Sequence, residues 1–404
     1  MYGRYLANHP LLRLYLHVSD GIAALLAKHH SREIGGLALP PRRLLLCNGA
    51  HMGDVVISSG IVGVLRHLLP ETRLGFLTGS WSRPVVDHIP HLSWHHELDH
   101  TKLNRSGNPL GRRILQHVQS RRRVLREISD VGYDVAVDLY PFFPNSAWLL
   151  AKAGIPTRIG FASGGGGPLL THSMDFHDDN LPMAQLQSAL LDSLPVDRAR
   201  LQHLRDNGLP PCLISSQQKV AASLPERGYV VVHTGTGAPA REWAEENWLA
   251  LIRRLAADGH QILLTGHGDR ECNRAARLVE KSSTDTGTSI TNLCGQLRLD
   301  DLLGVIGRAR LLIGVESLAG HLGAALDTPS VILWSGTSNI YQWHPNGRRL
   351  HVLQMELPCK PCFRAAGCAT MECMMFTVES VYQVCCDRLS NPDLSMQITS
   401  YSLG

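Results

Sequence analysis

Residues 43–54 read RLLLCNGAHMGD, and their pattern predicts how the first half of the chain folds. The apolar run at 44–47 predicts a buried strand, the next four residues predict a turn, and the apolar spacing from Asp54 to Leu68 predicts a helix. A second apolar run at 74–77 predicts the next strand. Buried strands that alternate with helices are typical of a parallel sheet with helices on both faces.

The same alternation continues and then starts again in the second half of the chain. Further strands are predicted at 135–137, 158–160, 229–233, 261–264, 311–314 and 331–334, and a helix is predicted at 245–257. The polar segment 206–217 predicts a linker, and the glycine run at 164–167 predicts a mobile loop. The fold class is therefore α/β, with two Rossmann-like domains that face a central cleft.

Length and composition limit the class of protein. The chain has 404 residues, 44% of them hydrophobic and 18% charged, which predicts two or three domains and excludes a disordered chain. A formal net charge of +4 argues against a dedicated nucleic-acid binder. The apolar stretch Gly21–Ala27 is too short to span a membrane, and Arg13 and Asp20 interrupt the segment as no signal peptide would. We expect a cytoplasmic protein whose ten cysteines are thiols or metal ligands.

Residues 1–40 are expected to form a helical appendage ahead of the first strand. Five apolar residues recur at helical spacing and share one face: Leu11, Tyr15, Val18, Ile22 and Leu25. Two interpretations are open for this stripe. It packs on the body of the protein, or it contacts a partner or a membrane surface.

The turn after the first strand holds the first candidate site. Gly49 and Gly53 permit a tight turn, and the free amides at the start of the following helix favour a nearby anion. Asp54 lies at this helix N-terminus. The spacing alone allows Asp54 to be a helix cap or a carboxylate with a chemical role.

A glycine-rich loop opens the second series. Residues 234–243 read TGTGAPAREW, in which Gly235, Gly237 and Ala240 satisfy the dinucleotide pattern G-x-G-x-x-A. Pro239 lies where the phosphate-binding helix should begin, so this pattern only weakly supports a nicotinamide cofactor. Arg241 suits a diphosphate because a guanidinium is permanently charged, although a plain surface arginine is the common alternative.

A second loop with candidate ligands follows the strand at 311–314. Glu316 and Ser317 are expected at a helix N-terminus, where backbone amides hold phosphate oxygens and a carboxylate accepts hydrogen bonds from ribose hydroxyls. Capping by Ser317 is the alternative for that residue. His321 by itself is equally compatible with a core histidine.

Together these pieces resemble glycosyltransferase family 9, which contains the ADP-heptose:lipopolysaccharide heptosyltransferases. They occur in the family's order over residues 43–390: Met52–Asp54, Arg241–Trp243 with Glu245 and Trp248, Asn292–Gly295, Glu316–His321 and Gly336-Thr337. The resemblance implies a GT-B enzyme with an inverting mechanism. The implied domains are a helical appendage at 1–40, an acceptor-binding domain at 41–215, a donor-binding domain at 216–380, and a C-terminal helix and tail at 381–404.

The resemblance also assigns roles to single residues. Asp54 matches the family's proposed general base, Arg241 a phosphate-binding lysine, and Glu316 an aspartate at the donor site. The implied donor-binding residues are Thr234, Gly235, Arg241, Gly266, Glu316, Ser317, Leu318, Gly320 and His321. The implied acceptor-side residues are Gly53, His51, Arg112 and Arg113. Leu318 stands where the family has a glycine, and Glu316 is one methylene longer than aspartate; both departures bear on the identity of the donor.

Two clusters stand apart from these motifs. Eight basic residues gather between Thr101 and Asp130: Lys102, Arg105, Arg112, Arg113, Arg121, Arg122, Arg123 and Arg126. They form either a solvated helix face or a site for a phosphorylated lipid acceptor or an anionic membrane.

The second cluster consists of four cysteines: Cys359, Cys362, Cys368 and Cys373. Their spacing is that of a structural zinc site, and packed thiols or disulfides are the alternatives.

The first hypothesis is transfer of a heptose from ADP-heptose to a hydroxyl of a glycan such as the lipopolysaccharide inner core. We expect no required metal cofactor, because the sequence has no Asp-x-Asp motif. We expect the enzyme to be cytoplasmic. Peripheral contact with the inner face of the membrane is left open. The alternatives are a small secondary metabolite as acceptor, a nicotinamide-dependent oxidoreductase, and a catalytically silent nucleotide-binding scaffold that docks through residues 10–26.

Overall fold

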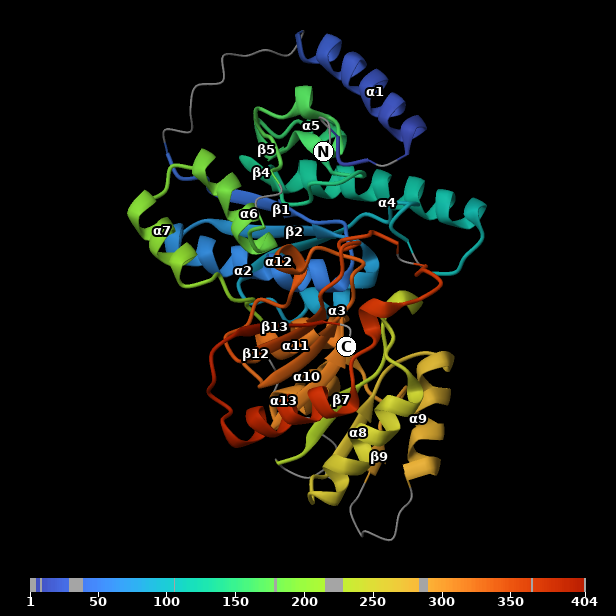
Figure 1. Ribbon diagram of the computed structural model, residues 1–404. Helices are drawn as coiled ribbons and strands as arrows, with labels where there is room; N and C mark the ends of the chain where they lie inside the picture. The colour runs from blue at the N-terminus through green and yellow to red at the C-terminus, as the bar shows by residue number, and fades with distance from the viewer. Residues whose placement is uncertain are drawn as a thin grey trace. The chain divides into compact units, whose positions relative to one another are not determined.

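A computed structural model describes residues 5–7, 9–28, 39–104, 106–177, 180–214, 228–282, 290–364 and 366–402. The chain divides into two compact units, Met1–Cys212 and Leu213–Gly404 (Figure 1). The boundary falls inside the linker predicted at 206–217, of which residues 215–217 lie outside the described part.

The first unit is built on a fully parallel six-stranded sheet in the order β3-β2-β1-β4-β5-β6. Its strands are β1 (Arg43–Cys47), β2 (Arg73–Thr78), β3 (Leu92–Glu97), β4 (Val135–Asp138), β5 (Thr157–Phe161) and β6 (His172–Met174). Its α-helices are α1 (Pro10–Lys28), α2 (Met52–Leu68), α3 (Arg83–Val86), α4 (Leu110–Val131), α5 (Ala147–Lys152), α6 (Met183–Ala189) and α7 (Arg198–Asp206). Leu45, Val124 and Ile128 belong to one buried cluster, which joins α4 to the sheet.

The second unit has a fully parallel seven-stranded sheet in the order β13-β12-β11-β10-β7-β8-β9. Its strands are β7 (Val230–His233), β8 (Ile262–Thr265), β9 (Ile290–Asn292), β10 (Leu311–Val315), β11 (Ser330–Trp334), β12 (Leu350–Met355) and β13 (Gln397–Tyr401). Its α-helices are α8 (Glu245–Ala257), α9 (Asp269–Ser282), α10 (Leu299–Gly307), α11 (Leu318–Ala325), α12 (Ile340–Trp343) and α13 (Val378–Ser390).

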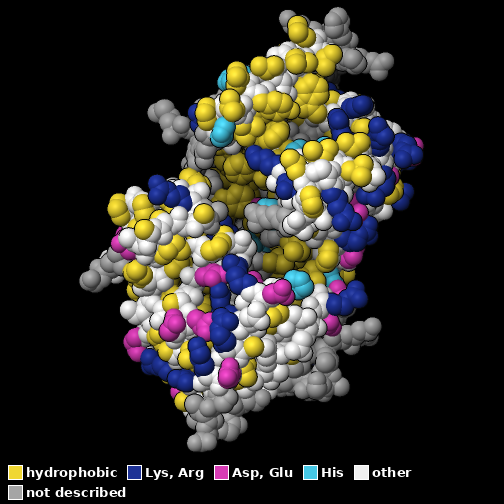
Figure 2. All heavy atoms as spheres, turned by 90° about the vertical axis from the view of Figure 1, so that its right-hand side faces the viewer, with side chains coloured by type: hydrophobic (Ala, Val, Ile, Leu, Met, Phe, Trp, Pro, Cys, Tyr) yellow, Lys and Arg dark blue, Asp and Glu magenta, His cyan; other side chains and the backbone are white. Residues whose placement is uncertain are grey.

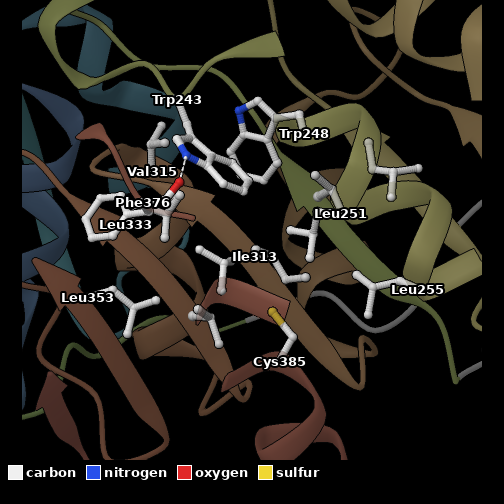
Figure 3. Packing of buried hydrophobic residues seen from close by; sticks show 14 of the residues in the cluster. Trp243, Trp248, Leu251, Leu255, Ile313, Val315, Leu333, Leu353, Phe376 and Cys385 are labelled. Carbon is white, nitrogen blue, oxygen red and sulfur yellow. Dashed lines mark hydrogen bonds between the residues drawn. The ribbon is translucent and has the colours of Figure 1, made fainter. Parts of the chain in front are cut away.

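Two tryptophans organise the core of the second unit. The rings of Trp243 and Trp248 meet edge to face, with 5.0 Å between their centroids, and both side chains are buried (Figure 3). The indole Nε1 of Trp243 donates to the carbonyl oxygen of Phe376 at 3.1 Å, so its polar atom is satisfied inside the core. This contact ties the segment after β7 to the segment before α13.

The predicted α/β class is confirmed, and each strand predicted from an apolar run is present. No strand was predicted after 331–334, but β12 and β13 follow it in the structure. Strand β12 contains His351 and Gln354, which interrupt its apolar pattern. Both are buried and bonded to β13, His351 to Thr399 at 2.8 Å and Gln354 to Ser400 at 3.0 Å.

Helix α1 buries the face opposite to its apolar stripe. Leu11, Tyr15, Val18, Ile22 and Leu25 are between 51% and 69% exposed, whereas Leu16, Asp20 and Ala23 are buried. Asp20 can lie in the interface because it accepts hydrogen bonds from the Tyr5 hydroxyl at 2.8 Å and from the Gly166 amide at 2.6 Å. The interpretation that the stripe packs on the body is therefore wrong, since the body receives the more polar side of the helix.

The glycine run at 164–167 is a packing surface for α1, which contradicts the predicted mobile loop. Gly164–Gly167 are buried, and the Asn145 amide donates to the Gly165 carbonyl at 2.6 Å. Gly165 has φ +86°, and a Cβ at this position would lie 2.6 Å from Leu16 Cδ2. Glycine is needed here because the positive φ disfavours other residues and because the Leu16 side chain of α1 lies directly over the run.

We expect Gly165→Ala to detach α1 while leaving the sheet of the first unit folded. Gly154→Ala is the matched control, because Gly154 also has a positive φ of +74° but nothing lies within 4 Å of an added Cβ. Both variants carry backbone strain, and overpacking should cost Gly165→Ala about 1–3 kcal/mol more. Thermal unfolding and limited proteolysis within residues 10–28 measure the effect, and equal behaviour of the two variants would contradict this packing.

Candidate functional site

In both units the loops with candidate residues follow strands at the point where the strand order reverses. In the first unit this point lies between β1 and β4, and in the second between β7 and β10. Loops at such a point leave the carboxyl edge of the sheet in opposite directions and open a crevice for ligands. The loop after β1 leads to Asp54, and the loops after β7 and β10 lead to Arg241 and Glu316.

Side chains from three elements fix the loop between β1 and Asp54. Asn48 accepts the Ala50 amide at 3.1 Å and donates to Ser58 Oγ at 2.8 Å. Ser58 donates to Gln187 Oε1 at 3.1 Å, and Trp81 Nε1 donates to the Ala50 carbonyl at 2.7 Å. The loop therefore holds one conformation through bonds to α2, α6 and the segment after β2.

Asp54 lies in the first turn of α2, and its Oδ2 accepts the His51 backbone amide at 3.0 Å. The capping role that the spacing allowed is thus present in the structure. The side chain is partly exposed, so a second role in binding remains compatible with its position. Gly49 and Gly53 both lack a positive φ, so the expectation that two glycines enable a tight turn is wrong: Gly53 is already helical.

The other acceptor-side residues have different surroundings. His51 and Gly53 flank the N-terminus of α2 and are partly exposed. Arg113 donates to the Thr101 carbonyl, and Leu103 of the same segment lies 3.8 Å from the Cβ position of Gly49. Arg113 thus steadies a segment that contacts the loop, whereas Arg112 is exposed on α4.

A carboxylate that the sequence analysis missed ends β4. Asp138 is buried and accepts the backbone amides of Ser146 at 2.5 Å and Tyr140 at 3.3 Å. Burial raises the pKa of Asp138 to about 7, and the two amide hydrogen bonds oppose this shift. Asp138 therefore holds the segment after β4 beside the β1 loop.

The loop after β7 is not a dinucleotide fingerprint. Pro239–Arg241 form a single 3-10 turn, and helix α8 begins only at Glu245. A phosphate-binding helix would have to start directly after the glycines. The geometry therefore removes the motif on which the nicotinamide-dependent oxidoreductase hypothesis depended.

Three consecutive residues of this segment serve three purposes. Arg241 points to Glu316, with Nη1 and Oε1 3.1 Å apart, and Trp243 enters the core. Glu242 between them pairs with Arg270 at 3.0 Å and with Arg274. These two arginines also donate to the carbonyls of the β7 loop, Arg270 to Thr236 at 2.7 Å and Arg274 to Thr234 at 3.0 Å.

Glu316 is the centre of a buried polar cluster. Its Oε1 accepts the Ser338 hydroxyl at 2.8 Å and its Oε2 accepts the Ser335 hydroxyl at 3.0 Å. Arg241 Nε also donates to Thr337 Oγ1 at 3.3 Å. Burial raises the pKa of Glu316, and the charge of Arg241 and the two serine hydroxyls work against that shift. The cluster joins β10, the segment after β11 and the 3-10 turn that carries Arg241.

The N-terminus of α11 presents polar atoms that have no partner in the described part of the chain. Ser317 stands at the N-cap without a side-chain capping bond, and its buried Oγ has no hydrogen-bond partner. The same holds for the buried Nδ1 of His321, one turn further along. Burial, followed by the charges of His344 and Arg241, lowers the pKa of His321 to about 4, so the imidazole is neutral at pH 7.

The remaining predicted donor residues differ in purpose. Gly320 packs on the sheet, because an added Cβ would lie 3.1 Å from both Ile332 and Pro345. Leu318 begins α11 and is partly exposed. Thr234 is buried, and its carbonyl is held by Arg274. Gly320 thus has a packing role, and its part in donor binding stays a prediction.

Positions 235 and 266 require glycine, because the Glu271 carboxylate lies where a Cβ would be. A Cβ on Gly235 would lie 2.0 Å from Glu271 Oε2, and a Cβ on Gly266 would lie 2.8 Å from the same atom. Glu271 also accepts the His267 amide at 2.9 Å. No local motif marks Glu271, Arg270 or Arg274 in the sequence, because all three lie inside helix α9.

Two of the four clustered cysteines, Cys362 and Cys373, contact Gly336 in the segment after β11. The Cys362 amide donates to the Gly336 carbonyl at 2.8 Å, and Cys373 Sγ lies 3.8 Å from the Cβ position of Gly336. Within the described ranges no group of three His, Cys, Asp or Glu side chains is arranged to hold a metal ion. As placed, Cys359, Cys362, Cys368 and Cys373 do not fit the predicted zinc site.

Comparison with known proteins identifies the family of the chain. The model of glycosyltransferase family 9 (heptosyltransferase) matches residues 121–371. Lipopolysaccharide heptosyltransferase 1 of Pseudomonas aeruginosa is 26% identical over 249 residues, which cover 60% of this chain and 65% of that protein. Lipopolysaccharide heptosyltransferase 2 of Escherichia coli is 23% identical over 311 residues, 73% of this chain and 83% of that protein.

A solved structure shows the same fold. The E. coli ADP-heptose lipopolysaccharide heptosyltransferase II superposes with a TM-score of 0.65 at 20% identity, over 87% of this chain and 99% of that one. The family match covers more than half of the present chain and includes Arg241, Glu316 and His321. The chain therefore belongs to glycosyltransferase family 9, with a GT-B fold, and is a transferase enzyme.

Proposed function

We propose that the enzyme transfers a heptose from ADP-heptose to a hydroxyl of a lipopolysaccharide inner-core glycan, with inversion at the anomeric carbon. The names of the relatives support the sugar and the acceptor class. The observation that carries the proposal is the group of donors around the N-terminus of α11. Arg241, Ser317 and His321 there suit the diphosphate of a nucleotide sugar.

The leaving nucleoside diphosphate gains negative charge as the glycosidic bond breaks. Arg241 provides a permanent positive charge, and the N-terminus of α11 provides partial positive charge from its free amides. Glu316 and Thr337 engage the Nη1 and Nε donors of Arg241 and fix the direction of its guanidinium. The remaining N–H donors of this five-donor group are then available to phosphate oxygens.

Asp54 is the proposed general base. In a direct displacement the acceptor oxygen bonds to the anomeric carbon as the bond to the diphosphate oxygen breaks, and the hydroxyl proton passes to the Asp54 carboxylate. The hydrogen bond from the His51 amide orients this carboxylate. The rigid β1 loop supports this role because a misplaced base would lose the near-attack geometry.

The acceptor side of the proposal rests on the first unit. His51 and Gly53 flank the start of α2, Arg112 is exposed on α4, and Arg113 holds the segment that contacts Gly49. We place the reaction in the cytoplasm, at the inner face of the membrane.

Product analysis tests the reaction as a whole. The full-length enzyme is incubated with an inner-core acceptor and ADP-heptose, UDP-glucose or GDP-mannose, and mass spectrometry identifies the product. We expect a heptosylated acceptor with ADP-heptose alone. Transfer of a different sugar would overturn the proposed donor, and reduction of a nicotinamide cofactor would overturn the reaction class.

We expect Arg241→Ala to lower turnover about a hundredfold or more, because the developing diphosphate charge loses its cation. Arg277→Ala is the control in the same unit, since Arg277 makes an exposed ion pair with Glu245 at 2.6 Å. EDTA should leave the wild-type enzyme active. An absolute requirement for magnesium or manganese would contradict charge stabilisation by Arg241.

We expect ADP to raise the stability of the enzyme most at acidic pH, through His321. The pKa of His321 lies at about 4 in the folded protein against 6.5 for the free side chain, so between these values the unfolded chain binds the extra proton. Stability therefore falls as pH falls through this window. A bound diphosphate would favour the protonated ring and offset this loss.

Melting temperatures of the wild type and His321→Gln, with and without ADP from pH 7 to pH 4, test this linkage. His203→Gln, on an exposed face of α7, is the control. The acid-dependent gain from ADP should be smaller in His321→Gln than in the other two proteins. An equal gain in all three would show that the diphosphate does not contact His321.

We expect Asp54→Asn to lower turnover by about 10²- to 10⁴-fold with little change in melting temperature or ADP affinity. Asparagine keeps an oxygen that accepts the His51 amide, so the cap survives while the basicity is lost. Asp54→Ala should lose both, with an added destabilisation of about 1 kcal/mol. Near-normal turnover in Asp54→Asn would leave Asp54 as a helix cap only.

A further inference from the structure

Helix α1 offers an apolar surface that the described chain leaves uncovered. Its residues Leu11, Tyr15, Val18, Ile22 and Leu25 share one face and are each more than half exposed. Figure 2 shows hydrophobic side chains gathered over this end of the first unit. A row of large apolar side chains in water is costly for a soluble protein and indicates a surface that binds something apolar.

The opposite face of α1 fixes the helix along the body. Leu16 and Ala23 are buried, Asp20 accepts bonds from Tyr5 and Gly166, and Trp148 Nε1 donates to Ser19 Oγ at 3.2 Å. Among the described residues α1 is the one helix long and apolar enough to cross a membrane, over Pro10–Ala27, which corrects the expectation that no segment reaches that length. Crossing would carry the Asp20 carboxylate into hydrocarbon and break these contacts, so the geometry favours a helix that lies in the plane of an interface.

A groove runs between α1 and α4. It has a volume of about 390 Å³, and six of the residues that line it are Tyr15, Val18, Ile22, His117, Arg121 and Phe143. The groove is apolar on the α1 side and ends at a cation on the α4 side. That combination suits a molecule with a hydrocarbon part and an anionic head.

Helix α4 continues the same surface with apolar and basic residues. Leu110, Ile114 and Val118 follow one another at four-residue spacing and are exposed. Arg121 and Arg122 come three and four residues after Val118, so they extend the same side of the helix. In the described part of the chain, Arg121, Arg122 and Arg126 form no ion pair with a carboxylate.

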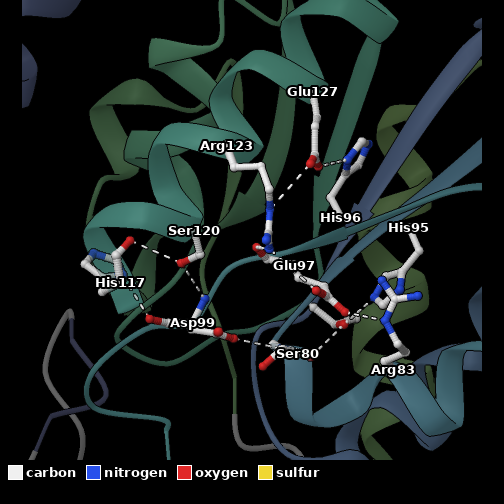
Figure 4. A network of polar contacts seen from close by, with 12 residues as sticks. Ser80, Arg83, His95, His96, Glu97, Asp99, His117, Ser120, Arg123 and Glu127 are labelled. Carbon is white, nitrogen blue, oxygen red and sulfur yellow. Dashed lines mark hydrogen bonds and ion pairs between the residues drawn. The ribbon is translucent and has the colours of Figure 1, made fainter. Parts of the chain in front are cut away.

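A polar network between α4 and the segment around β3 holds α4 in place and engages Arg123 (Figure 4). Arg123 pairs with Glu97 and Glu127, each at 3.5 Å. Ser120 Oγ accepts the Asp99 amide at 3.1 Å, which fixes the middle of α4 to the segment after β3. The unpaired arginines are therefore carried on a rigid helix beside the groove. Arg105, also in the predicted basic cluster, lies outside the described residues.

We propose that the exposed face of α1 together with Ile114, Val118, Arg121, Arg122 and Arg126 of α4, here called the α1/α4 surface, docks on an anionic phospholipid bilayer. The apolar row of α1 enters the interface between headgroups and acyl chains, and the arginines bind lipid phosphates. Charge decides between this occupant and a second copy of the chain. A two-fold contact through the same surface would bring the arginines of one copy against those of the other.

Docking extends the proposed function, because it would bring the enzyme to an acceptor that is carried by a lipid. The identity of that acceptor rests on the proposed function, but binding to a bilayer requires neither donor nor acceptor. Failure of one proposal is thus distinguishable from failure of the other.

Vesicle co-sedimentation of the full-length protein tests the proposal. Vesicles of phosphatidylcholine alone are compared with vesicles of phosphatidylcholine mixed with phosphatidylglycerol, at low and at high salt. We expect binding to the anionic vesicles, weakened by salt, and little binding to the neutral ones. Equal binding to both kinds of vesicle, or to neither, would overturn the proposal.

Two double variants locate the surface. Arg122→Glu with Arg126→Glu, and Val18→Asp with Ile22→Asp, should each weaken binding to anionic vesicles about tenfold or more. The control, Arg253→Glu with Arg348→Glu, makes the same charge change on exposed arginines of the other unit and should bind like the wild type.

Light scattering of the same proteins measures their oligomeric state. Unchanged oligomeric state together with lost binding supports the bilayer as the occupant. Dissociation of a wild-type dimer in the Val18→Asp, Ile22→Asp variant would assign the surface to a second copy instead, and wild-type binding by both double variants would overturn the proposal.

Discussion

The ion pair between the partly exposed Arg241 guanidinium and the buried Glu316 carboxylate joins the loops that carry the candidate donor residues. A carboxylate at the end of β10 is expensive to bury, and its pKa is raised for that reason. Arg241 and the hydroxyls of Ser335 and Ser338 offset this cost together. Since these partners come from the 3-10 turn after β7 and from the segment after β11, satisfying one carboxylate fixes three loops at the same edge of the sheet.

The parallel sheets explain why those loops meet at all. In each unit the strand order reverses next to the first strand of its series, and the loops that leave there carry the polar residues. Small residues then let polar groups approach the backbone closely. Gly235 and Gly266 make room for the Glu271 carboxylate, which could not lie over any larger residue at those positions.

Helix α1 also buries a carboxylate whose oxygens are satisfied by hydrogen bonds. Its inward face contains the carboxylate of Asp20, which is acceptable because Tyr5 and Gly166 satisfy its oxygens. Its outward face is apolar and exposed. Hydrogen bonds therefore attach the helix to the body, and its hydrophobic side chains stay available for another apolar phase.

Elements whose burial is uniform could be predicted from the sequence. Continuous apolar runs such as 44–47 and 311–314 became central strands, because a strand that is covered on both faces has no polar side to alternate with. These strands gave the fold class. They also predicted that Asp54, Arg241 and Glu316 follow the ends of strands. Strand β12 was missed because its polar residues are satisfied by β13, a partner more than 40 residues away.

The roles of the polar residues depend on contacts that form only in the folded chain. Periodicity located the apolar stripe of α1, but the contacts of Asp20 and the glycine run decided that the other face is buried. A glycine pattern suggested a dinucleotide site, and the 3-10 turn at Pro239–Arg241 removed it. Helix α9 places Glu271, Arg270 and Arg274 against the β7 loop. No local sequence pattern predicts this contact. Local sequence fixes which residues can be buried, whereas the partners that satisfy a buried charge come from distant segments and are set only when the chain folds.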